Sequence, residues 1–148
     1  MQVVPLTGGG AGAFGPLLRA LRAGRLVPLL ADRDLTASGV EVDLLGERAR
    51  VAPGPAALAL TSGAALHPVS IRYERPAGGS PRHGVVITWH PEVPVPAEGT
   101  KAERIAAMTQ GCADALGAAI RQTPQDWHML QRVFLADLDE AHRERVAP

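Results

Sequence analysis

The sequence predicts a domain of the α/β class, because apolar runs of strand length alternate with segments of helical periodicity. Residues 26–31 form an unbroken apolar run directly after a helical segment, which is typical of a parallel strand buried on both faces. Residues 69–73 and 85–89 alternate apolar with polar side chains around a Gly- and Pro-rich stretch, which predicts an antiparallel hairpin. Together these patterns predict a mixed sheet with helices on both of its faces.

The first helix is expected over residues 14–22, after a short strand over residues 1–6. Pro16 suits the first turn of this helix, and Gly24 suits the position just past its end. The helix should therefore lead directly into the apolar strand at residues 26–31.

The later elements are marked by turn and capping signals. Residues 32–53 are expected to form a loop or irregular stretch, and residues 54–63 a small helix opened by a Gly-Pro pair. Thr100 and Glu103 have the spacing of a capping box, which predicts the start of the longest helix. A further helix is expected from Pro124, with aromatic side chains that pack in the core.

The composition describes one globular domain of 148 residues, of which 46% are hydrophobic. Basic and acidic residues balance at 15 each, so the chain offers no basic surface for a nucleic acid. Cys112 is the only cysteine and lies on an apolar helical stripe, which indicates a buried thiol. His67 and His90 lack the spacing of metal ligands, so no metal site is expected. No run approaches the roughly 18 apolar residues of a transmembrane helix.

A glycine-rich run offers one alternative function. Gly10, Gly12 and Gly15 fit the G-x-G-x-x-G fingerprint of dinucleotide-binding domains, and Asp32 follows about twenty residues later. The helix N-terminus would bind the pyrophosphate and the carboxylate the ribose. Glycine is abundant in this chain, however, and the later strands form a hairpin instead of further strand–helix units. A glycine turn is the preferred interpretation, with a dinucleotide-binding module as the alternative.

A series of short motifs spans nearly the whole chain. They are Arg-x-Gly at 22–24, the apolar run at 26–31, Asp-Arg-Asp-Leu at 32–35, Gly-Val-Glu-Val at 39–42, Leu-Leu-Gly at 44–46, Gly-Pro-Ala at 54–56, Thr-Ser-Gly-Ala at 61–64 and Trp-His-Met-Leu-Gln at 127–131. This combination resembles the bacterial lipid acyltransferase superfamily, which includes lipid A lauroyl transferases and phosphatidylinositol mannoside acyltransferases. The mannoside branch is the closer match, through Asp-Arg-Asp-Leu and Trp-His-Met-Leu-Gln.

The resemblance implies the C-terminal part of a single acyltransferase domain over residues 1–136, followed by a charged, frayed tail over residues 137–148. The implied fold is related to glycerolipid acyltransferases. The implied reaction transfers a fatty acyl group from acyl-CoA to a sugar hydroxyl of a membrane glycolipid of the phosphatidylinositol mannoside type. Acyl-CoA would be a co-substrate, with no cofactor. The protein would be peripheral, at the cytoplasmic face of the bacterial plasma membrane.

The general base of this family is not found in the sequence. The family uses H-x-x-x-x-D, in which the histidine removes the hydroxyl proton as the hydroxyl attacks the thioester. The histidines are His67, His83, His90, His128 and His142, and none is followed five positions later by Asp or Glu. The N-terminal half of the family domain is therefore expected to be missing, and the chain alone to be inactive. A fragment, a truncated gene, a misassigned start and a non-catalytic remnant all remain open.

Four residues are the candidates for the site. Asp32, Arg33 and Asp34 follow the predicted parallel strand, whose carboxyl end would border a ligand crevice, and are assigned to substrate binding. Arg33 suits a bidentate phosphate contact, with a structural Asp–Arg network as the alternative. Resemblance to the mannoside branch implies that Glu41 is a supporting catalytic carboxylate, with a solvent-facing edge position as the alternative. We expect Asp32, Arg33 and Glu41 to wall one cleft.

Overall fold

The computed structural model describes residues 10–30, 32, 34, 39–75 and 84–137. Within these residues the fold is of the α/β class, with three α-helices and two antiparallel sheets of two strands each. The elements in chain order are α1 (Gly10–Arg22), β1 (Val40–Leu44), β2 (Glu47–Val51), α2 (Gly54–Ser62), β3 (Val69–Glu74), β4 (Gly84–Trp89), α3 (Lys101–Gln122) and the 3₁₀ turns η1 (Pro124–Asp126) and η2 (Leu135–Asp137). The predicted α/β class is confirmed, but the described residues contain no mixed sheet.

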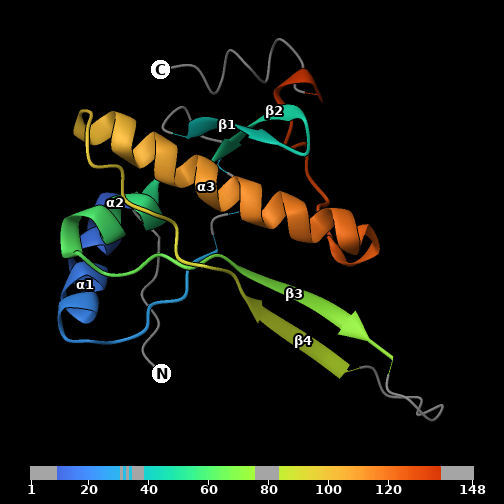
Figure 1. Ribbon diagram of the computed structural model, residues 1–148, viewed down its shortest axis with the longest axis horizontal. Helices are drawn as coiled ribbons and strands as arrows, with labels where there is room; N and C mark the ends of the chain where they lie inside the picture. Colours follow the sequence, from blue (N-terminus) through green and yellow to red (C-terminus); the bar gives the residue numbers. More distant parts are fainter. Residues whose placement is uncertain (1–9, 31, 33, 35–38, 76–83, 138–148) are drawn as a thin grey trace.

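Helix α3 is the central element, along which the other elements are arranged (Figure 1). Helix α2 packs on its N-terminal half and in turn contacts α1, whereas the β1–β2 hairpin packs on its C-terminal half. The predicted capping box is confirmed at the start of α3. The Glu103 N–H donates to Thr100 Oγ1 at 3.3 Å, and the Thr100 N–H donates to Glu103 Oε2 at 2.7 Å.

The β1–β2 hairpin contradicts the loop predicted for residues 32–53. Its two-residue turn has φ of 61° at Leu45 and 98° at Gly46, which fits a type I′ turn. Leucine is uncommon at positive φ, and the Leu-Gly pair here replaces the Asn-Gly pair that normally marks such a turn. The turn could therefore not be recognised from the sequence. The buried face of the hairpin consists of Val42, Leu44, Ala49 and Val51. With Ala113 of α3 and Val133, this face forms the first core cluster.

A second core cluster joins α2 to α3. It contains Ala56, Ala59, Val93 and Met108. Helix α2 confirms the small helix predicted over residues 54–63, with Gly63 in the left-handed region at its end. Gly111 permits a close approach, because a Cβ there would lie 2.8 Å from Val93 Cγ1. Cys112 packs beside the cluster, and burial raises the pKa of its thiol to about 11, which favours the structural interpretation.

The parallel strand predicted over residues 26–31 is wrong for the residues that are described. Residues 25–30 have no regular secondary structure, and none of the described strands pairs with them. Leu26 is 72% exposed and Leu30 is 100% exposed. An apolar strand is buried on both faces only where other strands and helices enclose it, and the described residues supply neither here. The strand predicted over residues 1–6 lies outside the described residues.

The helix predicted after Pro124 is also wrong. From Pro124 the chain makes the short η1 turn, and residues 127–130 have no regular secondary structure. Trp127 and Phe134 instead pack edge to face, with ring centroids 6.4 Å apart, against the first core cluster. An isolated antiparallel β-bridge pairs Phe134 with Ala49 of β2. The backbone at Phe134 is therefore paired with a strand and not with a helical turn. The tail beyond residue 137 lies outside the described residues.

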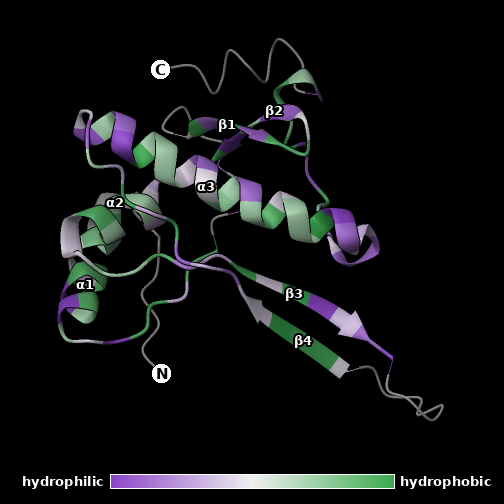
Figure 2. Ribbon diagram, viewed as in Figure 1, coloured by the Kyte–Doolittle hydropathy of each residue, from purple (hydrophilic) through white to green (hydrophobic). Residues whose placement is uncertain are grey.

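The β3–β4 hairpin confirms the antiparallel pair predicted from alternation at residues 69–73 and 85–89. It projects from the body of the molecule (Figure 1), and Figure 2 shows much of β4 in the hydrophobic colour. The two hairpins thus lie on different sides of α3, and the space near the C-terminal half of α3 is where a cavity forms.

Candidate functional site

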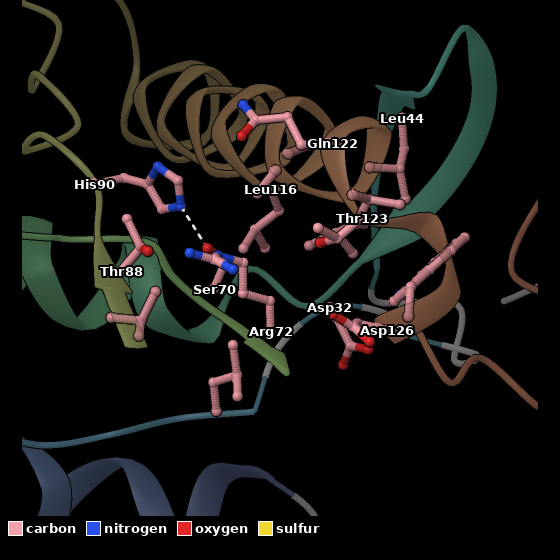
Figure 3. Close-up of a pocket in the computed structure, with 17 residues that line it drawn as sticks. Asp32, Leu44, Ser70, Arg72, Thr88, His90, Leu116, Gln122, Thr123 and Asp126 are labelled. Atoms are coloured by element: carbon pink, nitrogen blue, oxygen red, sulfur yellow. Dashed lines mark hydrogen bonds between the residues drawn. The ribbon is translucent and has the colours of Figure 1, made fainter. Parts of the chain in front are cut away.

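A cavity of about 220 Å³ lies between the C-terminal half of α3, the β3–β4 hairpin and the first core cluster (Figure 3). Its wall is largely apolar and includes Leu44, Leu116, Ile120 and Trp127. Its polar lining residues are Asp32, Ser70, Arg72, Thr88, His90, Gln122, Thr123 and Asp126. Such a site suits an amphiphilic ligand, with hydrocarbon against the wall and polar groups at the ends.

A serine–histidine pair lies at one end of the cavity. Ser70 Oγ is 2.9 Å from His90 Nε2, and Figure 3 draws this hydrogen bond between the ends of β3 and β4. The His90 backbone carbonyl in turn lies 3.1 Å from His67 Nδ1. The Ser70 hydroxyl and the His90 imidazole can each donate a hydrogen bond to a ligand hydroxyl or accept one from it. Ser70 was not predicted as a site residue, although the alternation in β3 sets it on the strand face opposite Ile71.

Acidic side chains mark another part of the cavity. Figure 3 shows Asp32 and Asp126 away from the Ser70–His90 pair. In this view Arg72 lies between the two aspartates on one side and the Ser70–His90 pair on the other. Asp126 Oδ2 accepts the backbone N–H of Tyr73 at 3.0 Å, which joins η1 to the edge of β3. Of the predicted acidic–arginine motif, Asp32 lines the cavity, and Arg33 lies outside the described residues.

Asp34 and Glu41 are brought together around Arg50 of β2. The Asp34 N–H donates to the Arg50 carbonyl at 2.8 Å, and Arg50 Nη2 lies 3.5 Å from Glu41 Oε1. Arg48 Nη2 donates to Glu41 Oε2 at 3.0 Å. The hydrogen bond from Arg48, followed by that from Arg50, lowers the pKa of the Glu41 carboxyl. Gly39 permits this packing, because a Cβ there would lie 3.0 Å from Asp34 Cβ.

The expected single cleft is not formed by the described residues. Glu41 is exposed, whereas Val42 and Leu44 point to the buried face of β1, and Leu44 lines the cavity. Because side chains alternate along a strand, Glu41 lies on the opposite face of β1 from Leu44. Asp32 therefore belongs to the cavity, and Glu41 belongs to an ion-pair cluster on the outer face of the β1–β2 hairpin.

The dinucleotide-binding alternative is not supported by the geometry. Residues 10–15 lie within α1, so the glycine run forms neither a phosphate-binding loop nor the preferred glycine turn. Residues 25–30, which precede Asp32 in the chain, do not form a strand, which removes the second part of the fingerprint. The described residues gather no group of three or more His, Cys, Asp or Glu side chains that could hold a metal ion. Within the same residues, no helix has the length and hydropathy to cross a membrane.

Comparison with known proteins decides the family. The family model described as bacterial lipid A biosynthesis acyltransferase matches residues 1–136. The chain belongs to this acyltransferase family. The resemblance found in the sequence motifs is thereby confirmed.

Relatives with curated names point to one branch of the family. The chain is 41% identical over 145 residues to a protein of Mycolicibacterium smegmatis named phosphatidylinositol mannoside acyltransferase. It is also 41% identical over 145 residues to a Mycobacterium tuberculosis protein of the same name. Each alignment covers 98% of this chain, but only 44% and 42% of the respective relative. The chain thus spans less than half the length of these curated relatives.

Proposed function

We propose that this chain forms part of an acyltransferase that moves a fatty acyl group from acyl-CoA to a sugar hydroxyl of a glycolipid of the phosphatidylinositol mannoside type. The observation that carries the proposal is the 41% identity to phosphatidylinositol mannoside acyltransferases across nearly the whole chain. The cavity is consistent with it, because an apolar wall with hydroxyl, imidazole and carboxylate groups suits a lipid with a sugar head.

Separate roles are assigned to the Asp32–Asp34 motif and to Glu41. Asp32 lines the cavity and would accept hydrogen bonds from sugar hydroxyls, with Arg33 and Asp34 as the adjoining substrate-binding residues. Arg33 would contact a phosphate of the coenzyme or of the phosphoinositide. Glu41 is proposed as a supporting carboxylate on the strength of the family resemblance, acting from the outer face of β1, where the hydrogen bond from Arg48 lowers the pKa of its carboxyl.

The proton-removing group would be supplied by residues beyond those in this sequence. His67, His90 and the other histidines lack the family's H-x-x-x-x-D spacing. A general base usually contributes about 100- to 10,000-fold in rate, so we propose that the chain alone is inactive. The reaction would take place at the cytoplasmic face of the bacterial plasma membrane, with the protein bound peripherally, because the acceptor is a membrane lipid.

A chimera tests this function. The 145 matched residues of the M. smegmatis relative are replaced by this chain, and the product is incubated with acyl-CoA and phosphatidylinositol mannoside. We expect an acylated glycolipid by mass spectrometry from the chimera and none from this chain alone. A chimera that is folded by circular dichroism but transfers no acyl group would refute the proposal.

A further inference from the structure

One face of the β3–β4 hairpin is apolar and open to solvent. Its large side chains are Ile71, Tyr73, Val85, Ile87 and Trp89, each between 51% and 59% exposed, and we call this set the apolar hairpin face. The strand register sets Ile71 directly across from Ile87, and Tyr73 across from Val85, so these side chains project from the same side of the sheet. The opposite side carries Ser70, Arg72 and Thr88, which line the cavity; of the apolar hairpin face, Ile71 also borders the cavity.

This face requires a covering element. A two-stranded sheet is marginally stable in water by itself, and a contiguous apolar patch of this kind marks an interaction surface. No third strand among the described residues pairs with β3 or β4. The exposed leucines Leu26 and Leu30 form a second apolar stretch that nothing described encloses. The chain therefore presents two apolar surfaces that no described residue covers.

The chemistry of the face favours a polypeptide over a lipid surface. Ile71, Val85 and Ile87 are β-branched residues of the kind that fill the interior of packed sheets. The face contains no charged side chain, and Arg72 projects from the other side. Surfaces that lie on anionic membranes normally surround their apolar residues with an excess of Lys and Arg, whereas the 15 basic residues of this chain are balanced by 15 acidic ones, so it has no net charge.

The relatives indicate which polypeptide this is. The matched 145 residues make up 44% of the M. smegmatis relative, so more than half of that protein has no counterpart in this chain. We call those unmatched residues the complementary segment. An α/β domain encloses its strands with further strands and helices, and the complementary segment is long enough to supply them.

We propose that the apolar hairpin face is an internal docking surface for a polypeptide with the sequence character of the complementary segment. The Leu26–Leu30 stretch would be enclosed by the same polypeptide. The proposal rests on family membership and the exposed face, and does not depend on the acyl-transfer chemistry. Docking would also cover the sheet face opposite the Ser70–His90 pair. The position of the hairpin, and with it the shape of the cavity, would then depend on the docked polypeptide.

The first test is binding in trans. The complementary segment of the M. smegmatis relative is co-expressed with this chain and isolated by an affinity tag. We expect a one-to-one complex by native mass spectrometry. Ile87→Asp should weaken binding by about 30-fold or more, as a substitution at the centre of an interface does. Leu130→Asp is the matched control, because Leu130 is 95% exposed and lies outside the hairpin, and it should bind normally.

The second test measures protection of the face and does not need the complementary segment to fold by itself. Cys112→Ala removes the only thiol of this chain, any cysteine in the relative's part of the chimera is replaced by serine, and Ile87→Cys or Leu130→Cys then supplies a single reporter. In this chain alone both reporters should react rapidly with a maleimide. In the chimera described above, the cysteine of Ile87→Cys should react at roughly one tenth of that rate or more slowly still. The reaction rate of Leu130→Cys should be unchanged.

The alternatives give distinct results. Equal labelling of Ile87→Cys in the chain and the chimera would overturn the proposal, as would complex formation that Ile87→Asp does not affect. Binding of this chain alone to phosphatidylglycerol vesicles, with Ile87→Cys protected there, would assign the face to a membrane. A dimer of this chain alone that protects Ile87→Cys would assign it to a second copy. Protection in a chimera that transfers no acyl group would retain the docking surface and refute only the proposed function.

Discussion

The β1–β2 and β3–β4 hairpins share an alternating pattern but differ in what covers their apolar faces. The first buries Val42 and Leu44, at 1% and 3% exposure, against α3 and the segment that follows it. The second leaves Ile71 and Ile87 at 59% and 58% exposure. Alternation thus determines which side chains share a face, whereas burial depends on another element that supplies the opposing surface. The chain supplies that surface for one hairpin, and the described residues do not supply it for the other.

The largest expected contrast is between two valines in the two hairpins. Val42→Ala should lower the free energy of unfolding by about 1.5–3 kcal/mol, because it removes fully buried methyl groups. Val85 is 56% exposed, so Val85→Ala should cost less than about 1 kcal/mol. Chemical denaturation followed by circular dichroism measures both. Equal losses would mean that the β3–β4 hairpin is as enclosed as its counterpart.

A smaller effect is expected at the start of α3, the helix against which the β1–β2 hairpin packs. Thr100→Ala removes the acceptor for the Glu103 N–H and should lower the free energy of unfolding by about 1 kcal/mol. Lys101→Ala is the neighbouring control and should change it little, because Lys101 is exposed. If the two variants unfold at the same denaturant concentration, the capping box contributes nothing measurable.

The smallest effect concerns the outer face of the β1–β2 hairpin. Glu41→Gln should cost about 0.2–1 kcal/mol at neutral pH, as expected of an exposed ion pair with Arg48. The folded-state pKa of Glu41 is lowered, so its contribution is present above the ordinary value of 4.5 and is lost as the pH falls through the folded value. Thermal unfolding from pH 7 to pH 3 measures this. A difference from wild type that persists unchanged at pH 3 would exclude the ion pair as its cause.

Local signals in the sequence predicted those elements that are specified by residues close together in the chain. Helix α3 begins at the Thr100–Glu103 capping box, and the alternation in β3 and β4 gave the correct pairing. Prediction failed where a distant contact decides the local structure. Leu45 adopts positive φ in a turn that its sequence does not favour, because the strands on both sides pack on α3. Trp127 and Phe134 likewise pack on the first core cluster, and the chain around them does not form the predicted helix.

The candidate site was predictable only in part. Asp32 was singled out from its place after an apolar run, and it does line the cavity. Glu41 was expected beside it, but strand alternation turns its side chain to the other face of β1. Ser70 and His90 could not be paired from the sequence, since twenty residues separate them and only the hairpin register brings them within 2.9 Å. Family motifs name residues, whereas the register of the strands decides which residues meet.

Amide hydrogen exchange in the two hairpins tests the comparison most directly. The central claim is that β1–β2 is enclosed by this chain and that the β3–β4 face is enclosed by the complementary segment. In the chain alone, amides of Val40–Leu44 should exchange slowly and those of Gly84–Trp89 rapidly; in the chimera, both should exchange slowly. Slow exchange of Gly84–Trp89 in the chain alone, or no gain of protection in the chimera, would contradict the account.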